Sequence, residues 1–165
     1  MISIKALQRR YHAVCEGKLV SGFDVDRPIG RDPKNRTKQV VSESGKEAFT
    51  EIRVMQRYNS HSLVQAELKT GRTHQIRVHM EHTGHPLFGD VSYGGNRAVK
   101  GVRGGKYQAF LNNCFERLPR QALHARSLGF THPNTGKWME FDTSLPEDMQ
   151  EVLSKWKAYL GGLSA

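Results

Sequence analysis

The sequence has few cysteines, few aromatic residues and no long apolar run. Cys15 and Cys114 are the two cysteines of its 165 residues, and they show no Cys-x-x-Cys spacing. They are too few for a disulfide scaffold, so we expect a protein of a reducing, cytoplasmic compartment. No apolar run approaches the roughly 20 residues of a membrane span, and no signal-peptide core opens the sequence. The length suits one domain or part of one.

Acidic residues are also in the minority. The sequence has 25 Lys and Arg against 16 Asp and Glu, a formal net charge of +9. Clustered cations release counterions when they bind nucleic acid, so this excess favours a polyanionic partner. A basic surface that serves solubility alone is the alternative.

Two pairs of alternating segments predict β-hairpins. Residues 48–55 alternate with Ala48, Thr50, Ile52 and Val54 on one face, and residues 61–68 follow with Val64, Ala66 and Leu68 on one face. A second pair, residues 122–130 and 138–141, flanks a Pro-Asn-Thr-Gly turn. We therefore expect an α+β fold with a mixed, mainly antiparallel sheet and flanking helices.

The last helix is marked by its own start signal. Ser144 stands three residues before Glu147 in a capping box, with Pro146 in the first turn. Apolar residues then recur at helical spacing: Met149, Val152, Leu153, Trp156 and Leu160. We expect this helix to pack on the core and to carry no chemistry.

Two charged or glycine-rich stretches are predicted to be loops. Residues 24–38 mix acidic and basic side chains with proline and glycine, and Arg31, Arg36 and Lys38 could contact phosphate there. The alternative is a solvated face on which opposite charges partly cancel. Residues 94–106 are glycine-rich and basic, and we expect either a mobile loop that a bound nucleic acid orders or a surface insertion without contact to it.

The most particular stretch is residues 68–93. It reads Leu-Lys-Thr-Gly-Arg-Thr-His-Gln-Ile-Arg-Val-His and then Gly-His-Pro-Leu-Phe-Gly-Asp-Val-Ser-Tyr. A strand, a break at Thr70-Gly71 and a helix from about Thr73 would place cationic and polar side chains at one corner. This corner suits a phosphate or a carboxylate. Its side chains are Arg72, His74, Gln75, Arg77 and His79.

Other chemistry fits these residues less well. A metal site among His74, His79, His82 and His85 has poor spacing, because same-face helical ligands lie three or four residues apart. We expect His74 and His79 instead to fix the helix and the following loop through Asp90. A serine hydrolase would need a Gly-x-Ser-x-Gly elbow, and a phosphate-binding loop would need a Lys-Ser/Thr ending.

Residues 68–93 resemble the third conserved motif of the RluA-type pseudouridine synthases. Residues 71–79 and 84–94 match that motif almost residue for residue, and four further segments fit the family pattern. They are Arg10-Tyr11-His12-Ala13-Val14 with Gly17, Pro28-Ile29-Gly30-Arg31, Gln121-Ala122-Leu123-His124-Ala125 and His132-Pro133. The resemblance covers nearly the whole chain.

The resemblance implies isomerisation of uridine to pseudouridine in structured RNA, most of all large-subunit ribosomal RNA, without cofactor or metal. Arg77 matches the basic residue that would pair with the nucleophilic carboxylate. Tyr11 matches the tyrosine that would stack on the flipped uracil and assist proton transfer. The half-buried tyrosine of an ordinary strand is the alternative for Tyr11. Arg72, His74 and Gln75 would contact RNA, and orienting the turn is the alternative for Arg72 and Gln75.

One motif of the family has no counterpart. The nucleophilic aspartate lies in an Arg-Leu-Asp motif ahead of the tyrosine segment, and no stretch of this sequence resembles it. We therefore expect residues 1–165 to form the C-terminal part of a catalytic domain, inactive alone, whose partner is the nucleophile-bearing N-terminal half. A non-catalytic RNA-binding module derived from such an enzyme is the alternative.

Overall fold

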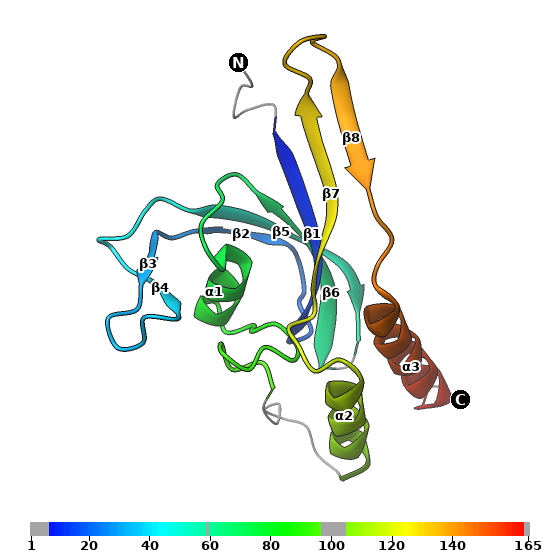
Figure 1. Ribbon diagram of the computed structural model, residues 1–165. Helices are drawn as coiled ribbons and strands as arrows, with labels where there is room; N and C mark the ends of the chain where they lie inside the picture. Colours follow the sequence, from blue (N-terminus) through cyan, green and yellow to red (C-terminus); the bar gives the residue numbers. More distant parts are fainter. Residues whose placement is uncertain (1–6, 59, 97–104, 164–165) are drawn as a thin grey trace.

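The computed structural model describes residues 7–58, 60–96 and 105–163. A six-stranded antiparallel sheet in the order β2-β5-β6-β1-β7-β8 forms the centre, and a separate two-stranded sheet, β3-β4, lies beside it (Figure 1). The strands of the large sheet are β1 (Gln8–Glu16), β2 (Phe23–Asp26), β5 (Phe49–Arg57), β6 (His61–Leu68), β7 (Leu123–Thr131) and β8 (Trp138–Asp142). Those of the small sheet are β3 (Ile29–Arg31) and β4 (Gln39–Val41).

Three helices accompany the sheets: α1 (Gln75–His82), α2 (Gly105–Arg117) and α3 (Glu147–Leu163). The predicted α+β class with a mainly antiparallel sheet is confirmed. No helix in the described part of the chain is long and apolar enough to cross a membrane.

Both predicted hairpins are present. In the first, β5 pairs antiparallel with β6, and the predicted inner face is confirmed because Val64, Ala66 and Leu68 are all buried. The register shifts between Val54 and Gln56, where a bulge bends β5. In the second, β7 pairs antiparallel with β8 around the predicted turn.

Alternate residues of β1 serve two cores on opposite faces of the sheet. Ala13 and Cys15 pack with α1 through Ile76 and Met80, whereas Val14 packs with α2 and α3. We call the side that α1 covers the α1 face and the other the α3 face. Tyr11, two residues before Ala13, lies on the α1 face.

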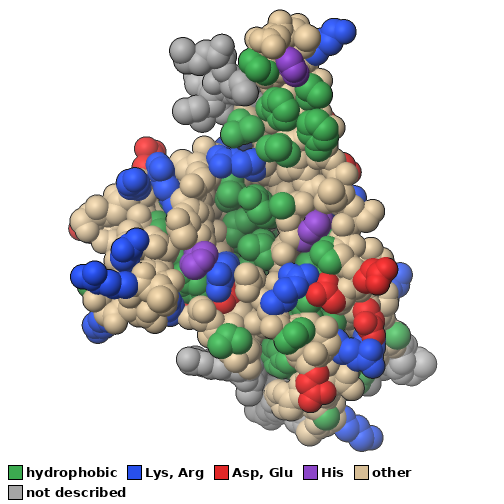
Figure 2. Space-filling view, in the orientation of Figure 1, with side chains coloured by type: hydrophobic (Ala, Val, Ile, Leu, Met, Phe, Trp, Pro, Cys, Tyr) green, Lys and Arg blue, Asp and Glu red, His purple; other side chains and the backbone are tan. Residues whose placement is uncertain are grey.

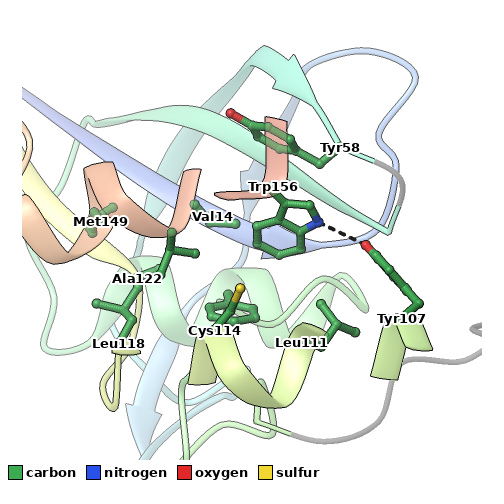
Figure 3. Close-up of a cluster of buried hydrophobic side chains, with 11 residues drawn as sticks. Val14, Tyr58, Tyr107, Leu111, Cys114, Leu118, Ala122, Met149 and Trp156 are labelled. Atoms are coloured by element: carbon green, nitrogen blue, oxygen red, sulfur yellow. Dashed lines mark hydrogen bonds between the residues drawn. The ribbon is translucent and has the colours of Figure 1, made fainter. Parts of the chain in front are cut away.

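The core on the α3 face is built around Trp156 (Figure 3). The Trp156 indole N–H donates to the Tyr107 hydroxyl at 3.0 Å, and Leu111 and Cys114 pack from α2. Met149, Val152 and Trp156 are buried, so the prediction that the last helix packs on the core is confirmed.

The structure corrects the prediction of a loop over residues 24–38. β2 and β3 form there, because Val25 and Ile29 are buried while β2 pairs with the edge of β5. α2 was not predicted, and it takes Gly105 and Lys106 from the stretch expected to be mobile. Most of that stretch, residues 97–104, lies outside the described residues.

Candidate functional site

A pocket of about 330 Å³ opens on the α1 face. Its floor includes Leu68, Ile76 and Leu123, and Figure 2 shows hydrophobic side chains gathered between α1 and β7, bordered by basic and histidine side chains. We call this cavity the Tyr11 pocket. Its polar lining consists of Tyr11, Arg72, His74, Gln75, Arg77 and Gln121. Three separate segments of the sequence, around Tyr11, Gln75 and Leu123, therefore meet in one cavity with an apolar floor and a cationic rim.

Tyr11 has small neighbours on both sides. Its partners in the sheet are Ala66 on β6 and Ala125 on β7. Residues directly opposite in antiparallel strands share a face, so the two alanines leave space beside the phenol ring. No hydrogen bond engages the Tyr11 hydroxyl within the described parts of the chain. The ring can therefore take a stacking partner, and its hydroxyl is free to donate or accept.

Gln75 fixes the turn that leads from β6 into α1. Its Oε1 accepts from the Thr70 hydroxyl at 2.8 Å and from the Arg72 N–H at 3.0 Å. Its Nε2 donates to the Phe49 carbonyl and to Thr50 Oγ1, both at 2.9 Å. These four bonds use the whole amide group of a buried residue. An RNA contact by Gln75 stays a prediction, and in the structure this residue stabilises the turn between β6 and α1.

His74 stands at the N-cap of α1 in the left-handed region, with φ 53°. Its Nδ1 lies 2.9 Å from the Tyr93 hydroxyl, which itself accepts from the Gln39 N–H at 3.0 Å. Burial, followed by the charge of Arg77, lowers the pKa of His74, so the ring is neutral near pH 7. From this network we assign the Tyr93 hydroxyl as the donor to Nδ1 and the ring proton to Nε2.

Arg77 is held by Asp90. Its Nε and Nη2 donate to the two carboxylate oxygens, each at 2.9 Å. The Asp90 side chain is completely buried and that of Arg77 is 13% exposed. This hydrogen bonding raises the pKa of Arg77, and the guanidinium also lies 4.8 Å from the centre of the Tyr93 ring. Arg77 is therefore a fixed cation at the pocket rim, with Nη1 outside the pair.

The loop after α1 positions Asp90. The Asp90 N–H donates to the Leu87 carbonyl and the Gly95 N–H donates to the Asp90 carbonyl at 2.8 Å. A Cβ at Gly95 would lie 1.6 Å from the Leu87 carbonyl oxygen, so this close turn requires glycine.

The expected pairing of His74 and His79 with Asp90 is wrong. Asp90 is taken by Arg77, His74 contacts Tyr93, and His79 is hydrogen-bonded to Thr50 Oγ1 at 2.7 Å and to the Arg27 carbonyl at 2.8 Å. The left-handed backbone at His74 turns its side chain away from the helical phase that sequence spacing assumes. Burial lowers the pKa of His79, which suits a neutral structural histidine.

The remaining predicted residues lie on or beside the β3-β4 sheet. Arg31 lines a second pocket of about 450 Å³ that shares Arg72 with the Tyr11 pocket. The Lys38 ammonium lies 4.9 Å from the centre of the Tyr93 ring. Arg36 is exposed between β3 and β4 and lines neither cavity. The structure thus brings Arg31 near the Tyr11 pocket and leaves Arg36 apart from it.

Sequence reasoning missed Tyr93 as the residue that joins these parts. It contacts His74, Arg77 and Lys38 and receives the Gln39 N–H. Its place in the quoted Gly-Asp-Val-Ser-Tyr stretch was the available signal. Among the described residues, no group of three or more His, Cys, Asp or Glu side chains is arranged to hold a metal ion.

Comparison with known proteins finds similar sequences among the RNA pseudouridine synthases. The family model described as RNA pseudouridylate synthase matches residues 1–82. Ribosomal large subunit pseudouridine synthase D of Vibrio vulnificus is 43% identical over 154 residues, covering 90% of this chain and 46% of that protein. The protein of the same name from Pseudomonas aeruginosa is 42% identical over 153 residues, covering 93% and 47%. The chain thus spans about half the length of these curated relatives.

A solved structure shares the fold. The chain of human RNA Pseudouridylate Synthase Domain Containing 1 matches with a TM-score of 0.65 and 22% identity, covering 93% of this chain and 67% of that one. At this identity the likeness concerns the fold.

Proposed function

Because this chain belongs to the RluA-type family of RNA pseudouridine synthases, we propose that it is part of an enzyme that isomerises uridine to pseudouridine in structured RNA. One observation supports this most: Tyr11 and Arg77 line a single pocket with an apolar floor although they lie in different segments of the sequence. Its size and apolar floor suit a base that has left its stack.

The reaction rearranges bonds within one nucleotide. The N1–C1′ bond of uridine breaks and a C5–C1′ bond forms, while C5 loses a proton and N1 gains one. The Tyr11 ring would stack on the detached uracil, and its unpaired hydroxyl would take part in the proton transfer at C5. His74, with its proton on Nε2, would donate to the base or to a phosphate.

Arg77 would hold the nucleophile. With Nε and Nη2 engaged by Asp90, Nη1 is the group that would meet an aspartate carboxylate at the pocket mouth and keep it ionised. No sequence like the family's Arg-Leu-Asp motif is found in this chain. We propose that residues 1–165 are the C-terminal part of the catalytic domain and that a preceding segment supplies this aspartate.

The substrate would be large-subunit ribosomal RNA, in keeping with the names of the relatives from Vibrio vulnificus and Pseudomonas aeruginosa. The net charge of +9 suits a polyanion. A cytoplasmic location would follow from that substrate and suits the two free, buried cysteines.

Tritium release from ribosomal RNA labelled at uridine C5 tests the proposal. The chain is assayed alone and after addition of a separately expressed segment carrying Arg-Leu-Asp. We expect release only in the mixture and its loss in Tyr11→Phe, which removes no internal hydrogen bond, and in Arg77→Lys, which keeps the charge but not the paired geometry. Release in the mixture that both variants retain would refute the assigned roles.

A second function has one observation in its favour. Asp90 already neutralises Arg77 within this chain, so the cleft is complete as a binding surface without a nucleophile. A non-catalytic RNA-binding module would bind ribosomal RNA with the same salt dependence in both samples and release no tritium in either.

A further inference from the structure

The second pocket, beside the Tyr11 pocket, is basic. It has a volume of about 450 Å³ and contains three cationic side chains, Arg31, Lys46 and Arg72, with no carboxylate among its lining residues. Figure 2 shows Lys and Arg side chains gathered over the part of the molecule that carries β3 and β4. We call this cavity the basic pocket. Its charge favours an anionic ligand.

Lys46 is placed by backbone contacts. The N–H and C=O groups of Lys46 both bond to Ile29, at 2.8 and 2.9 Å. A Cβ on the preceding Gly45 would lie 2.4 Å from the Ile29 carbonyl carbon, so glycine permits the close approach that sets Lys46 beside β3. Lys46 is itself exposed, which leaves its ammonium accessible to a ligand.

Arg72 is fixed from the other wall. Its Nε donates to the Glu47 carbonyl at 2.7 Å, whereas Nη1 and Nη2 make no hydrogen bond within the described segments. Arg72 lines both the basic pocket and the Tyr11 pocket. A ligand that fills both would pass directly over its guanidinium, whose fork geometry suits phosphate.

We propose that the basic pocket binds a backbone phosphate of the RNA strand, next to the nucleotide whose uracil occupies the Tyr11 pocket. Lys46 and Arg31 neutralise this phosphate and Arg72 lies between the two nucleotides. This inference rests on the proposed function for the identity of the polyanion. It assigns the strand a path across the surface, from β1 over the β6–α1 turn to the β3-β4 sheet.

The test is the salt dependence of RNA binding. A fluorescein-labelled single-stranded RNA of ten nucleotides with one central uridine is titrated with the chain at several NaCl concentrations, and binding is read by fluorescence anisotropy. Because each neutralised phosphate on a single strand contributes about −0.7 to the slope of log K against log salt, and Lys46 and Arg31 face the same phosphate, the double change Lys46→Ala with Arg31→Ala should make the slope less negative by about 0.7 and each single change by less. Lys157→Ala, an equal charge change on the exposed side of α3, should leave it unchanged.

A modified RNA distinguishes one bound phosphate from general attraction. Replacing one linkage next to the uridine with an uncharged methylphosphonate should weaken binding to the parent chain about threefold or more and have no further effect on the double variant Lys46→Ala with Arg31→Ala. Unchanged slopes in Lys46→Ala and Arg31→Ala, an equal change in Lys157→Ala, or no RNA binding by the parent chain would overturn the proposal. A changed slope, with no tritium release by the mixture that contains the Arg-Leu-Asp segment, would support the phosphate site and refute the enzymatic function.

Discussion

Arg77 illustrates how closely stability and function are joined at a single residue. Asp90 is a fully buried carboxylate whose charge is balanced by Arg77 alone among the ion pairs of the described residues. Removing one partner of a buried pair leaves the other charge without compensation, which costs far more than the pair contributes. A loss of activity in Arg77→Ala would therefore have two causes, a destabilised fold and the loss of the proposed catalytic contact.

We predict that Arg77→Ala lowers the free energy of unfolding by about 3 kcal/mol, because the Asp90 carboxylate stays buried without a cation. Arg77→Met combined with Asp90→Leu should cost less than Arg77→Ala alone. Urea denaturation of the three chains measures both values. A single variant within about 0.5 kcal/mol of the parent would mean that Asp90 reaches solvent once Arg77 is gone.

The backbone is strained at the start of α1. His74 is the non-glycine residue with positive φ in the described chain, and such a conformation costs a side chain about 1 kcal/mol or more. It is kept because it turns the imidazole toward Tyr93 and the Tyr11 pocket. We read this as local strain retained for the site.

We predict that His74→Gly is more stable than His74→Ala by about 1 kcal/mol. Both variants lose the bond to Tyr93, so their difference isolates the backbone cost at this position. Thermal or urea unfolding measures it, and both variants should bind RNA more weakly than the parent. Equal stabilities would indicate that residue 74 leaves the left-handed region when the imidazole is removed.

The elements differ in how far the sequence alone predicts them. β6 is predicted from the alternation of apolar and polar residues, because Val64, Ala66 and Leu68 all lie on the buried face of the strand. α2 was missed although Tyr107, Leu111 and Cys114 recur at helical spacing, because the glycine-rich stretch before it gives no start signal. β2 and β3 were missed because pairing with β5 and β4, rather than propensity, makes these short segments strands.

The sequence likewise predicts one part of the site and not another. The sequence predicts that Arg72, His74 and Arg77 converge, because strand, turn and helix follow one another there. It does not predict that Asp90 pairs with Arg77 and not with His74 or His79, because this pairing depends on the path of the loop after α1. The spacing of residues in a helix or strand determines which face a side chain lies on, whereas the tertiary fold determines which distant side chain it contacts.

At the scale of the whole molecule, buried histidines tie stability to pH. Burial lowers the pKa of His61 to about 3. Between pH 6.5 and 3 the unfolded chain binds a proton at His61 that the folded chain does not, so the free energy of unfolding falls as the pH decreases through this window. Near pH 3 and below both states are protonated and the loss is complete.

We predict that His61 contributes about 2 kcal/mol to the decrease in unfolding free energy between pH 7 and pH 5. His61→Gln should show a correspondingly smaller decrease, and His82→Gln, at an exposed position on α1, should follow the parent. Urea unfolding at the two pH values measures this. An equal decrease in His61→Gln and the parent would contradict the assignment of His61 as a buried neutral base.

The α1 face has an apolar area beyond the Tyr11 pocket. Leu128 on β7 and Phe141 on β8 face each other in the sheet register and are 40% and 52% exposed, and Phe130 stacks on Phe141. Leu128 is also opposite Arg9, two residues before Tyr11 on β1, so this area and the pocket lie on one face. Figure 2 shows the hydrophobic side chains over the end that carries β7 and β8. Exposed apolar area beside an edge strand favours association.

We predict that the isolated chain self-associates through this area or binds the preceding segment of the catalytic domain. Sedimentation velocity should show a concentration-dependent mass for the parent, a monomer for Phe141→Lys, and the parent's behaviour for Val20→Lys, where a lone exposed valine is replaced. Adding the Arg-Leu-Asp segment should suppress self-association if it covers the same face. A monomeric parent with one cooperative unfolding transition would contradict the prediction, because this face would then be stable in water without a partner.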